Sequence, residues 1–289
     1  MIDYNKFIQN SIKYLFEYIV NNKLKSLVLG VSGGIDSTVV AGIAFMACRS
    51  ARIPLIGRSL PAHTNNPEEI NTATLVGRAF CNDFKEVPIE KIYAKVADEI
   101  ELAEDVKLTP LQLGNIKARL RMIYLYNLAS MCGGCVLDTD NKSEHELGFW
   151  TIHGDVGDLN CGIIYLWKTE VYELAHYLLD YYVIKEPLAQ PTQQSVAISE
   201  SMKLIPTDGN GVMNGGDCAQ FGLDNYEQVD DVLKTMYFPD DTIHTGNEYI
   251  RLIDSYNEQG VDKVMTLHQN SEFKRKHLPI FPTKKELGL

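Results

Sequence analysis

A short run of serine, glycine and acidic residues between two apolar segments is the part of this chain best suited to chemistry. The run is Ser32-Gly33-Gly34-Ile35-Asp36-Ser37. It follows residues 27–31, expected as a strand, and precedes an apolar helix expected over 37–48. Glycines let a backbone approach a ligand closely, and the first amides of a helix lack intrahelical partners. The run therefore predicts an anion site, which the helix dipole strengthens.

The spacing of these residues distinguishes between kinds of phosphate loop. It fits neither the lysine-containing Walker loop nor the glycine fingerprint of dinucleotide-binding proteins. A small-residue turn before a core helix would explain the glycines, but not Ser32, Asp36, Ser37 and Thr38 together. The run resembles the pyrophosphate loop of the ATP pyrophosphatases, which cleave ATP to AMP and pyrophosphate. That resemblance implies that the residues contacting ATP include Gly30, Val31, Ser32, Gly33, Gly34, Ile35, Asp36 and Ser37.

Further segments, in order along the chain, resemble the ammonia-dependent NAD synthetases. They are residues 115–122, 138–144, 148–151, 154–155, 158–160 and 166–171, so that the resemblance covers about residues 27–277. It implies a homodimer with an adenine-nucleotide-hydrolase-like α/β fold. It also implies that the chain adenylates the nicotinate carboxylate of deamido-NAD with ATP and then displaces AMP with ammonia to give NAD.

Charged residues in these segments match the family's phosphate and metal positions. Asp36 and Glu144 stand at family ligand positions for Mg²⁺, an ion that takes one or two carboxylates plus phosphate oxygens. Asp36 could instead cap the following helix. Lys168 matches a catalytic lysine that holds ATP phosphates, and Thr139 matches an ATP contact. A solvated lysine is the alternative for Lys168, although cations disfavour helix amino termini.

The resemblance also implies a deamido-NAD site. The residues at matching positions are Arg119, Tyr126, Phe149, Asp158 and Lys274. Arg119 and Arg121 could equally form the solvated face of an amphipathic helix. Core packing is the alternative for the two aromatic residues, Tyr126 and Phe149.

The second half-reaction requires ammonia, whereas ammonium dominates near neutral pH. A carboxylate would attract ammonium and help to remove its proton. Asp155 is our catalytic candidate, and a surface aspartate in a Gly-Asp turn is the alternative.

Five positions depart from the family pattern. Ile152 replaces a lysine at the dinucleotide, Leu188 a threonine or serine at ATP, and Phe273 a histidine near the substrate. Ser59 and Asn65 stand where arginine and glutamine are frequent around ATP. Weaker or altered recognition of the dinucleotide is the hypothesis that follows.

Hydrophobic periodicity predicts the elements that must position these residues. Strands are expected near 27–31, 53–60, 84–87 and 135–137, alternating with helices at 4–21, 37–48, 67–80, 89–102 and 110–131. Such alternation indicates an α/β fold, a doubly wound parallel sheet flanked by helices, with ligands at the carboxyl ends of strands. Further helices are expected at 169–182, 226–236, 246–256 and 261–276, which make the carboxy-terminal part helical. We expect a single domain over residues 1–289, with an irregular lid at 187–222.

Composition limits the classes of protein to consider. The 289 residues carry a formal charge of −11, which argues against a nucleic-acid-binding face. The longest apolar run, 39–48, is too short to cross a membrane, so we expect a cytoplasmic enzyme. Cys132 and Cys135 have CxxC spacing, but without a second pair a structural role is favoured over a metal site.

Two alternatives remain at this stage. One is another ATP pyrophosphatase that amidates or thiolates a different substrate, although thiolation of tRNA would call for a basic face. The other is a nucleotide-binding homologue whose catalysis is impaired by the departures.

Overall fold

A single parallel sheet organises the chain. The computed structural model describes residues 2–182, 191–207, 216–237, 247–276 and 281–288. Five strands pair in the order β3-β2-β1-β4-β5, and every pairing is parallel. They are β1 (Ser26–Gly30), β2 (Leu55–Ser59), β3 (Asp83–Glu86), β4 (Gly134–Asp138) and β5 (Leu159–Asn160). The doubly wound parallel sheet expected from the sequence is confirmed.

The position of β1 at the centre of the sheet determines where a ligand can enter. Leu27 pairs with Leu55 of β2 on one side and with Cys135 of β4 on the other. The chain therefore runs outward from β1 to β2 and β3, and then crosses back to β4 on the other side of β1. In open α/β sheets such a reversal leaves a crevice at the carboxyl ends of the strands, where ligands bind. The segment that begins at Val31 lies at this switch point.

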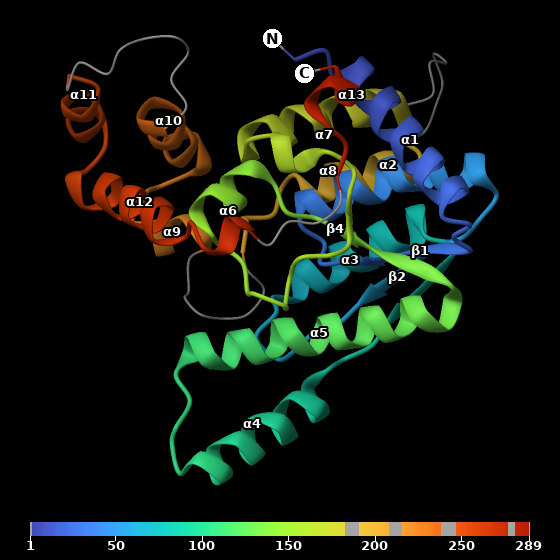
Figure 1. Cartoon of the computed structure of the whole chain (residues 1–289), viewed down its shortest axis with the longest axis horizontal. Coiled ribbons are helices and arrows are strands. Elements are labelled where there is room, and N and C mark those ends of the chain that lie inside the picture. Colours follow the sequence, from blue (N-terminus) through green and yellow to red (C-terminus); the bar gives the residue numbers. More distant parts are fainter. Residues whose placement is uncertain (1, 183–190, 208–215, 238–246, 277–280, 289) are drawn as a thin grey trace.

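Helices cover both faces of the sheet (Figure 1). One face carries α1 (Tyr4–Asn21), α2 (Ile35–Ala51), α3 (Pro67–Phe80), α7 (Lys168–Tyr182) and α8 (Gln193–Ser201), which share the largest apolar core. The other face carries α5 (Pro110–Cys132), which packs against the sheet, with α4 (Glu90–Glu104) beside it. Among the described residues, none of these helices combines the length and apolarity that a membrane crossing requires.

A second core lies beside the sheet, in the carboxy-terminal half of the chain. Its elements are α6 (Lys142–Leu147), α9 (Asp217–Phe221), α10 (Tyr226–Tyr237), α11 (Asn247–Ser255) and α12 (Glu258–Asn270). They pack around buried residues such as Phe221, Val229, Leu233 and Val264. The chain ends with α13 (Lys284–Leu287), which packs on α1. Two 3₁₀ turns, η1 (Ile163–Tyr165) and η2 (Lys274–Lys276), complete the described elements.

Helix boundaries follow local capping chemistry. Helix α3 begins with the Asn66 and Glu69 capping box and has Pro67 in its first turn. Helix α5 begins in the same way, with Thr109 and Gln112. In each case a side chain satisfies a backbone amide that the helix leaves without a partner. These starts were predictable because proline and capping residues act locally.

The segment 187–222 differs from the prediction. We expected an irregular stretch because prolines and glycines cluster there. In its described part, however, α8 spans Gln193–Ser201, and Ala197 and Ile198 are buried against the main core. Thr192 caps this helix by accepting a hydrogen bond from the Ser195 amide at 3.0 Å. The short α9 adds a second helical turn, so the prediction of irregular structure was wrong for these residues.

The short elements that the sequence did not predict include α6 and β5. Helix α6 has six residues and β5 has two, too few to show a hydrophobic period. Strand β5 exists because Leu159 pairs with Leu137 of β4. Pairing between distant segments leaves no local signal in the sequence.

The buried centre of β1 provides a test of the fold. Leu29 is 0% exposed in the main core, whereas Leu102 on α4 is 79% exposed. We expect Leu29→Ala to lower the free energy of unfolding by about 2–5 kcal/mol, because it leaves a cavity. The matched Leu102→Ala should change it by less than about 0.5 kcal/mol. Urea titration followed by circular dichroism measures both, and similar values for the two variants would contradict the placement of β1.

Candidate functional site

The backbone of the loop after β1 depends on its glycines. Gly33 has φ +92°, and a Cβ there would lie 2.5 Å from the backbone oxygen of Glu69 on α3. Gly34 is the N-cap residue of α2, and no side chain caps this helix. The first amides of α2 therefore face the end of the sheet with the positive end of the helix dipole behind them. Because no side chain caps α2, the alternative of Asp36 as its cap is wrong.

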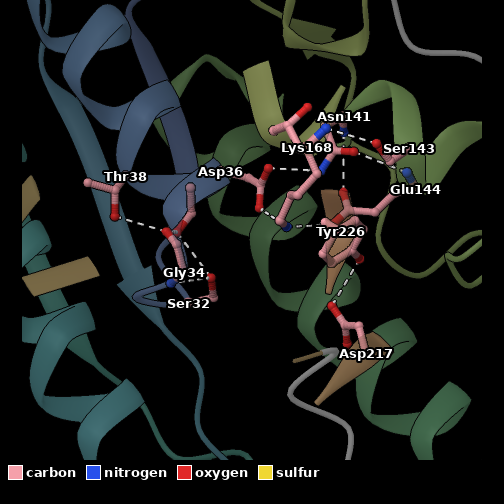
Figure 2. Close-up of polar contacts among 12 residues, drawn as sticks. Ser32, Gly34, Asp36, Thr38, Asn141, Ser143, Glu144, Lys168, Asp217 and Tyr226 are labelled. Carbon is pink, nitrogen blue, oxygen red and sulfur yellow. Dashed lines mark hydrogen bonds and ion pairs between the residues drawn. The ribbon is translucent and has the colours of Figure 1, made fainter. Parts of the chain in front are cut away.

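Hydroxyl groups fix the shape of this loop (Figure 2). The Oγ atoms of Ser32 and Ser37 lie 3.0 Å apart, and the Gly34 amide donates to Ser32 Oγ at 3.2 Å. Ser37 and Thr38 donate to the Gly34 carbonyl at 3.0 and 2.9 Å. The serine and threonine positions of the motif thus have a structural use, and the loop is preorganised before any ligand binds.

Lys168, Asp36 and Glu144 meet beside the loop. Lys168 is the first residue of α7 and only 3% exposed, and its Nζ lies 2.5 Å from Asp36 Oδ2 and 3.0 Å from Glu144 Oε1. Burial opposes the charge of Lys168, but the nearby carboxylates outweigh it and hold the pKa of this lysine above its usual range. Burial also raises the pKa of Glu144 to about 7, although the Lys168 ammonium acts in the opposite direction. The solvated alternative for Lys168 is therefore wrong.

Asn141 connects these groups and was not singled out by the sequence analysis. Its Nδ2 donates to Asp36 Oδ1 at 2.9 Å, and its side-chain oxygen caps α6 at the Glu144 amide. The Glu144 carboxylate in turn accepts a hydrogen bond from the Asn141 amide at 3.2 Å. The Asn-x-x-Glu capping box was the available signal, because it fixes where Glu144 lies relative to the strand end.

Two further aspartates at the end of β4 are buried. Burial raises the pKa of Asp138 to about 6, although Asp138 accepts hydrogen bonds from the Gly157 amide and from Asn160. Burial and then the charge of Asp138 raise the pKa of Asp140 well above its usual range. Asp155 accepts a hydrogen bond from the Thr151 amide at 2.7 Å.

Residues of the loop after β1, of the segment after β4 and of the start of α7 line one cavity of about 250 Å³. The expected site residues on its wall are Gly30, Val31, Ser32, Gly34, Ile35, Asp36, Ser37, Thr139, Glu144, Phe149, Asp155 and Lys168. Asp140 and Asp217 add further carboxylates to the same wall. The wall of the cavity is therefore rich in acidic groups beside the loop that follows β1.

Arg121 is a wall residue that the sequence analysis left undecided. It is half-buried and donates to the Leu60 carbonyl at 3.0 Å and to Asn65 Oδ1 at 3.1 Å. The alternative that Arg121 belongs to the solvated face of its helix is therefore wrong. Ser59 and Asn65, two of the departures from the family pattern, lie on the same wall. Ser59 is the last residue of β2, and Asn65 lies in the segment between β2 and α3.

Four residues expected at deamido-NAD lie outside the wall of this cavity. Tyr126 is 38% exposed and donates to Asp158 Oδ1 at 2.7 Å, so these two residues lie together. Arg119 is exposed and donates to the Ile152 carbonyl at 3.3 Å. Lys274 donates to two backbone carbonyls after α6, at 2.7 and 2.5 Å. Because Tyr126 is exposed, the alternative that it packs in the core is wrong.

The remaining aromatic and substituted positions fall in different surroundings. Phe149 contacts Phe221 edge to face, with ring centroids 4.8 Å apart, and also lines the cavity. Phe273 is 56% exposed, and Ile152 is half-buried. Leu188 lies outside the described residues. Core packing and access to the cavity thus coexist at Phe149.

The fold and the site define a protein of the α/β class with an acidic cavity at the switch point of its sheet, where a buried lysine lies between two carboxylates. The family model for NAD synthase matches residues 7–278, and the chain belongs to this family. The NH₃-dependent NAD⁺ synthetases of Pyrococcus furiosus and Campylobacter jejuni are 37% and 31% identical over 161 and 177 residues. These alignments cover 56% and 61% of this chain. They span 60% and 69% of the two relatives, so the chain matches less than two thirds of the Pyrococcus protein.

Solved structures agree on the fold. The structure of NMN synthetase from Francisella tularensis superposes with a TM-score of 0.73 at 22% identity, covering 98% of this chain and 100% of that one. NH₃-dependent NAD synthetase from Campylobacter jejuni gives a TM-score of 0.67 at 23% identity, with the same coverage. At such identities the likeness concerns the fold alone.

The two glycines of the loop make a matched pair for a test. Gly33→Ala should lower the free energy of unfolding by about 1–3 kcal/mol, because it forces a side chain into a left-handed conformation and against α3. Gly34 has φ −67°, and a Cβ there would meet only Ser32 Oγ at 3.4 Å. Gly34→Ala should therefore cost less than about 1 kcal/mol. Thermal and urea unfolding measure both, and equal losses would contradict the loop geometry.

Proposed function

We propose that this chain catalyses the ATP-dependent amidation of deamido-NAD to NAD with ammonia. AMP and pyrophosphate would be released, and the nicotinate carboxylate would be activated as an adenylate. The single observation that supports this most is the buried Lys168 between Asp36 and Glu144, beside the phosphate loop. Membership of the NAD synthase family supports the choice of reaction.

The first half-reaction would use the loop and Lys168. The loop amides and the serine hydroxyls would hold the phosphates, with Thr139 as a further ATP contact on the wall. As the nicotinate carboxylate attacks the α-phosphorus, the bond to pyrophosphate breaks and negative charge builds on the leaving oxygens. The Lys168 ammonium is fixed in place to offset that charge, with no reorganisation of solvent.

Asp36 and Glu144 have the chemistry that Mg²⁺ requires. Both carboxylates reach one nitrogen atom, so their oxygens lie close to a common point. Among the described residues, no group of three or more acidic, histidine or cysteine side chains could hold a metal. This agrees with an ion that takes two carboxylates from the protein and the rest from phosphates and water. When bound, Mg²⁺ would neutralise phosphate charge during cleavage.

The second half-reaction would use Asp155. Ammonium is attracted to an acidic wall, and the Asp155 carboxylate would accept a proton from it. The ammonia nitrogen then attacks the activated carbonyl carbon, and AMP leaves with the electron pair of the broken carbon–oxygen bond. Asp155 accepts a hydrogen bond from the Thr151 amide at 2.7 Å, which helps to fix its position on the wall.

Deamido-NAD would extend beyond the cavity. A volume of about 250 Å³ is below the range of about 300–1,000 Å³ that encloses one drug-sized ligand. It cannot enclose ATP and a dinucleotide together. Arg119, Tyr126, Asp158 and Lys274, which lie outside its wall, would then contact the dinucleotide where it leaves the cavity, with Phe149 at the wall itself.

We also propose an oligomeric state, a domain organisation and a cellular location for the protein. We propose a homodimer in which long helices form the interface. Exposed apolar side chains on α4 and α5 support this, among them Ile92, Leu111, Ile123 and Met131. A single domain with a lid within 187–222 and a cytoplasmic location remain proposals, and the six unpaired cysteines suit a reducing compartment.

A mass-spectrometric assay tests the function. Deamido-NAD, ATP, Mg²⁺ and ammonium should yield NAD, AMP and pyrophosphate in equal amounts. Asp36→Ala, Glu144→Ala and Lys168→Met should each lower kcat by at least about 100-fold, because each removes a charge at the reacting phosphates. Glu99→Ala, on the exposed α4, serves as the control and should keep the full rate.

Substrate choice is tested in the same assay. The departures at Ile152 and Phe273, which affect positions expected at the dinucleotide, make nicotinate mononucleotide the competing substrate to test. A kcat/KM that is higher for the mononucleotide would replace deamido-NAD in the proposal. Absence of AMP formation with either substrate would contradict the function.

The raised pKa of Glu144 leads to a pH prediction. Burial raises this pKa to about 7, so the carboxyl group is increasingly protonated as the pH falls below 7. Mg²⁺ requires the carboxylate, so the affinity for Mg²⁺–nucleotide should fall on acidification, by at most about tenfold per pH unit. Glu144→Gln should remove this dependence. Calorimetric titration between pH 5.5 and 8 measures it, and an identical slope in the variant would contradict the prediction.

A further inference from the structure

A buried carboxylate from the second core reaches the start of α7. Asp230 lies on α10 and is 1% exposed. Its Oδ2 accepts hydrogen bonds from the amide and the hydroxyl of Thr169, at 3.0 and 2.8 Å. Its Oδ1 accepts a hydrogen bond from the hydroxyl of Ser143 on α6. Both oxygens of Asp230 are therefore occupied by groups of the elements that carry Lys168 and Glu144.

Ser143 extends this contact to the backbone of Lys168. Its Oγ accepts a hydrogen bond from the Lys168 amide at 2.8 Å (Figure 2). The amides of Lys168 and Thr169 are among the first of α7, which the helix itself leaves without partners. Asp230 binds one of them directly and the other through Ser143. It thus caps α7 from a different helix, 61 residues further along the chain than Thr169.

The same face of α10 also contacts the ammonium end of Lys168. Tyr226 lies one helical turn before Asp230, and its ring centroid is 5.1 Å from Lys168 Nζ. Its hydroxyl donates to Asp217 Oδ2 at 3.3 Å. Residues four apart project from one face of a helix. Helix α10 therefore fixes both the backbone and the charged end of Lys168.

We infer that Asp230 is a positioning residue that orients Lys168 and Glu144 toward the phosphate loop. This inference rests on the proposed function, in which those two residues handle phosphate and metal. Asp230 does not reach the cavity itself, because it does not line the wall. Its effect passes through Ser143 and Thr169, which join the starts of α6 and α7. The second core thereby contributes to the site without a side chain in contact with the ligands.

The neighbouring Asp231 provides a matched control. It is also an aspartate of α10 with charged and hydroxyl partners, but these are Arg251, Thr235 and Tyr256. All of them belong to α10, to α11 or to the turn after α11. Asp231→Asn should therefore affect the second core without moving Lys168. Asp230→Asn keeps one oxygen for Thr169 but loses the second acceptor for Ser143, and Asp230→Ala loses both.

The experiment measures direct binding as well as turnover. Calorimetry measures the affinity for the probe, which is β,γ-imido-ATP together with Mg²⁺. Steady-state kinetics measures the formation of NAD and AMP. We expect Asp230→Ala to weaken binding of the probe or lower kcat by about 10- to 100-fold, as supporting residues of ligands commonly do. Asp230→Asn should recover part of the loss. The KM for deamido-NAD should stay unchanged in both, as should every parameter in Asp231→Asn.

The possible outcomes separate the inference from the proposed function. Wild-type protein that neither binds the probe nor forms product contradicts the function, and the inference falls with it. Wild-type binding and turnover that are retained in Asp230→Ala overturn the inference alone. An equal loss in Asp231→Asn also overturns it, because a general loosening of the second core would then explain the effect. If Asp230→Ala fails to fold, unchanged binding and kcat in a folded Asp230→Asn overturn it instead.

Discussion

The ion pairs of one buried ammonium hold the functional part of this molecule together. Lys168 binds Asp36 from α2 and Glu144 from α6, and Lys168 itself begins α7. Three helices that start at different places in the chain are therefore joined at a single nitrogen. Removing any one partner would leave a buried charge without compensation, which costs far more than a surface ion pair contributes. The same charges that stabilise this junction are those that a nucleotide phosphate and its cation need.

The sheet explains why such a junction can form beside a phosphate loop. Chain reversal at β1 leaves the carboxyl ends of β1 and β4 next to each other, and the loop after each strand carries acidic side chains. Gly33 lets the first loop pass within contact of α3, so the amides of α2 point toward the strand ends. Asn141 then ties the second loop to Asp36. The backbone geometry and the charge arrangement are thus parts of one structure.

The second core contacts the elements that carry Lys168 and Glu144. Helix α10 presents Tyr226 and Asp230 to the start of α7, so apolar packing around Val229 and Leu233 is connected to the orientation of Lys168. In the main core, by contrast, packing holds the sheet and the loop. A site built between two cores needs both to be folded, which makes its geometry sensitive to changes far from the cavity.

The sequence by itself determined the elements and the chemistry of the loop, because both depend on neighbours along the chain. Periodic apolar residues marked the long helices and strands, and the motif around Gly33 marked the loop at the end of β1. Tertiary structure decided what local pattern cannot encode. It paired the two residues of β5 with β4 and brought Asp230 to Lys168. It also placed Arg121 on the cavity wall but Tyr126 and Asp158 outside it. Contacts between distant segments depend on how whole faces pack, and no short stretch of residues carries that information.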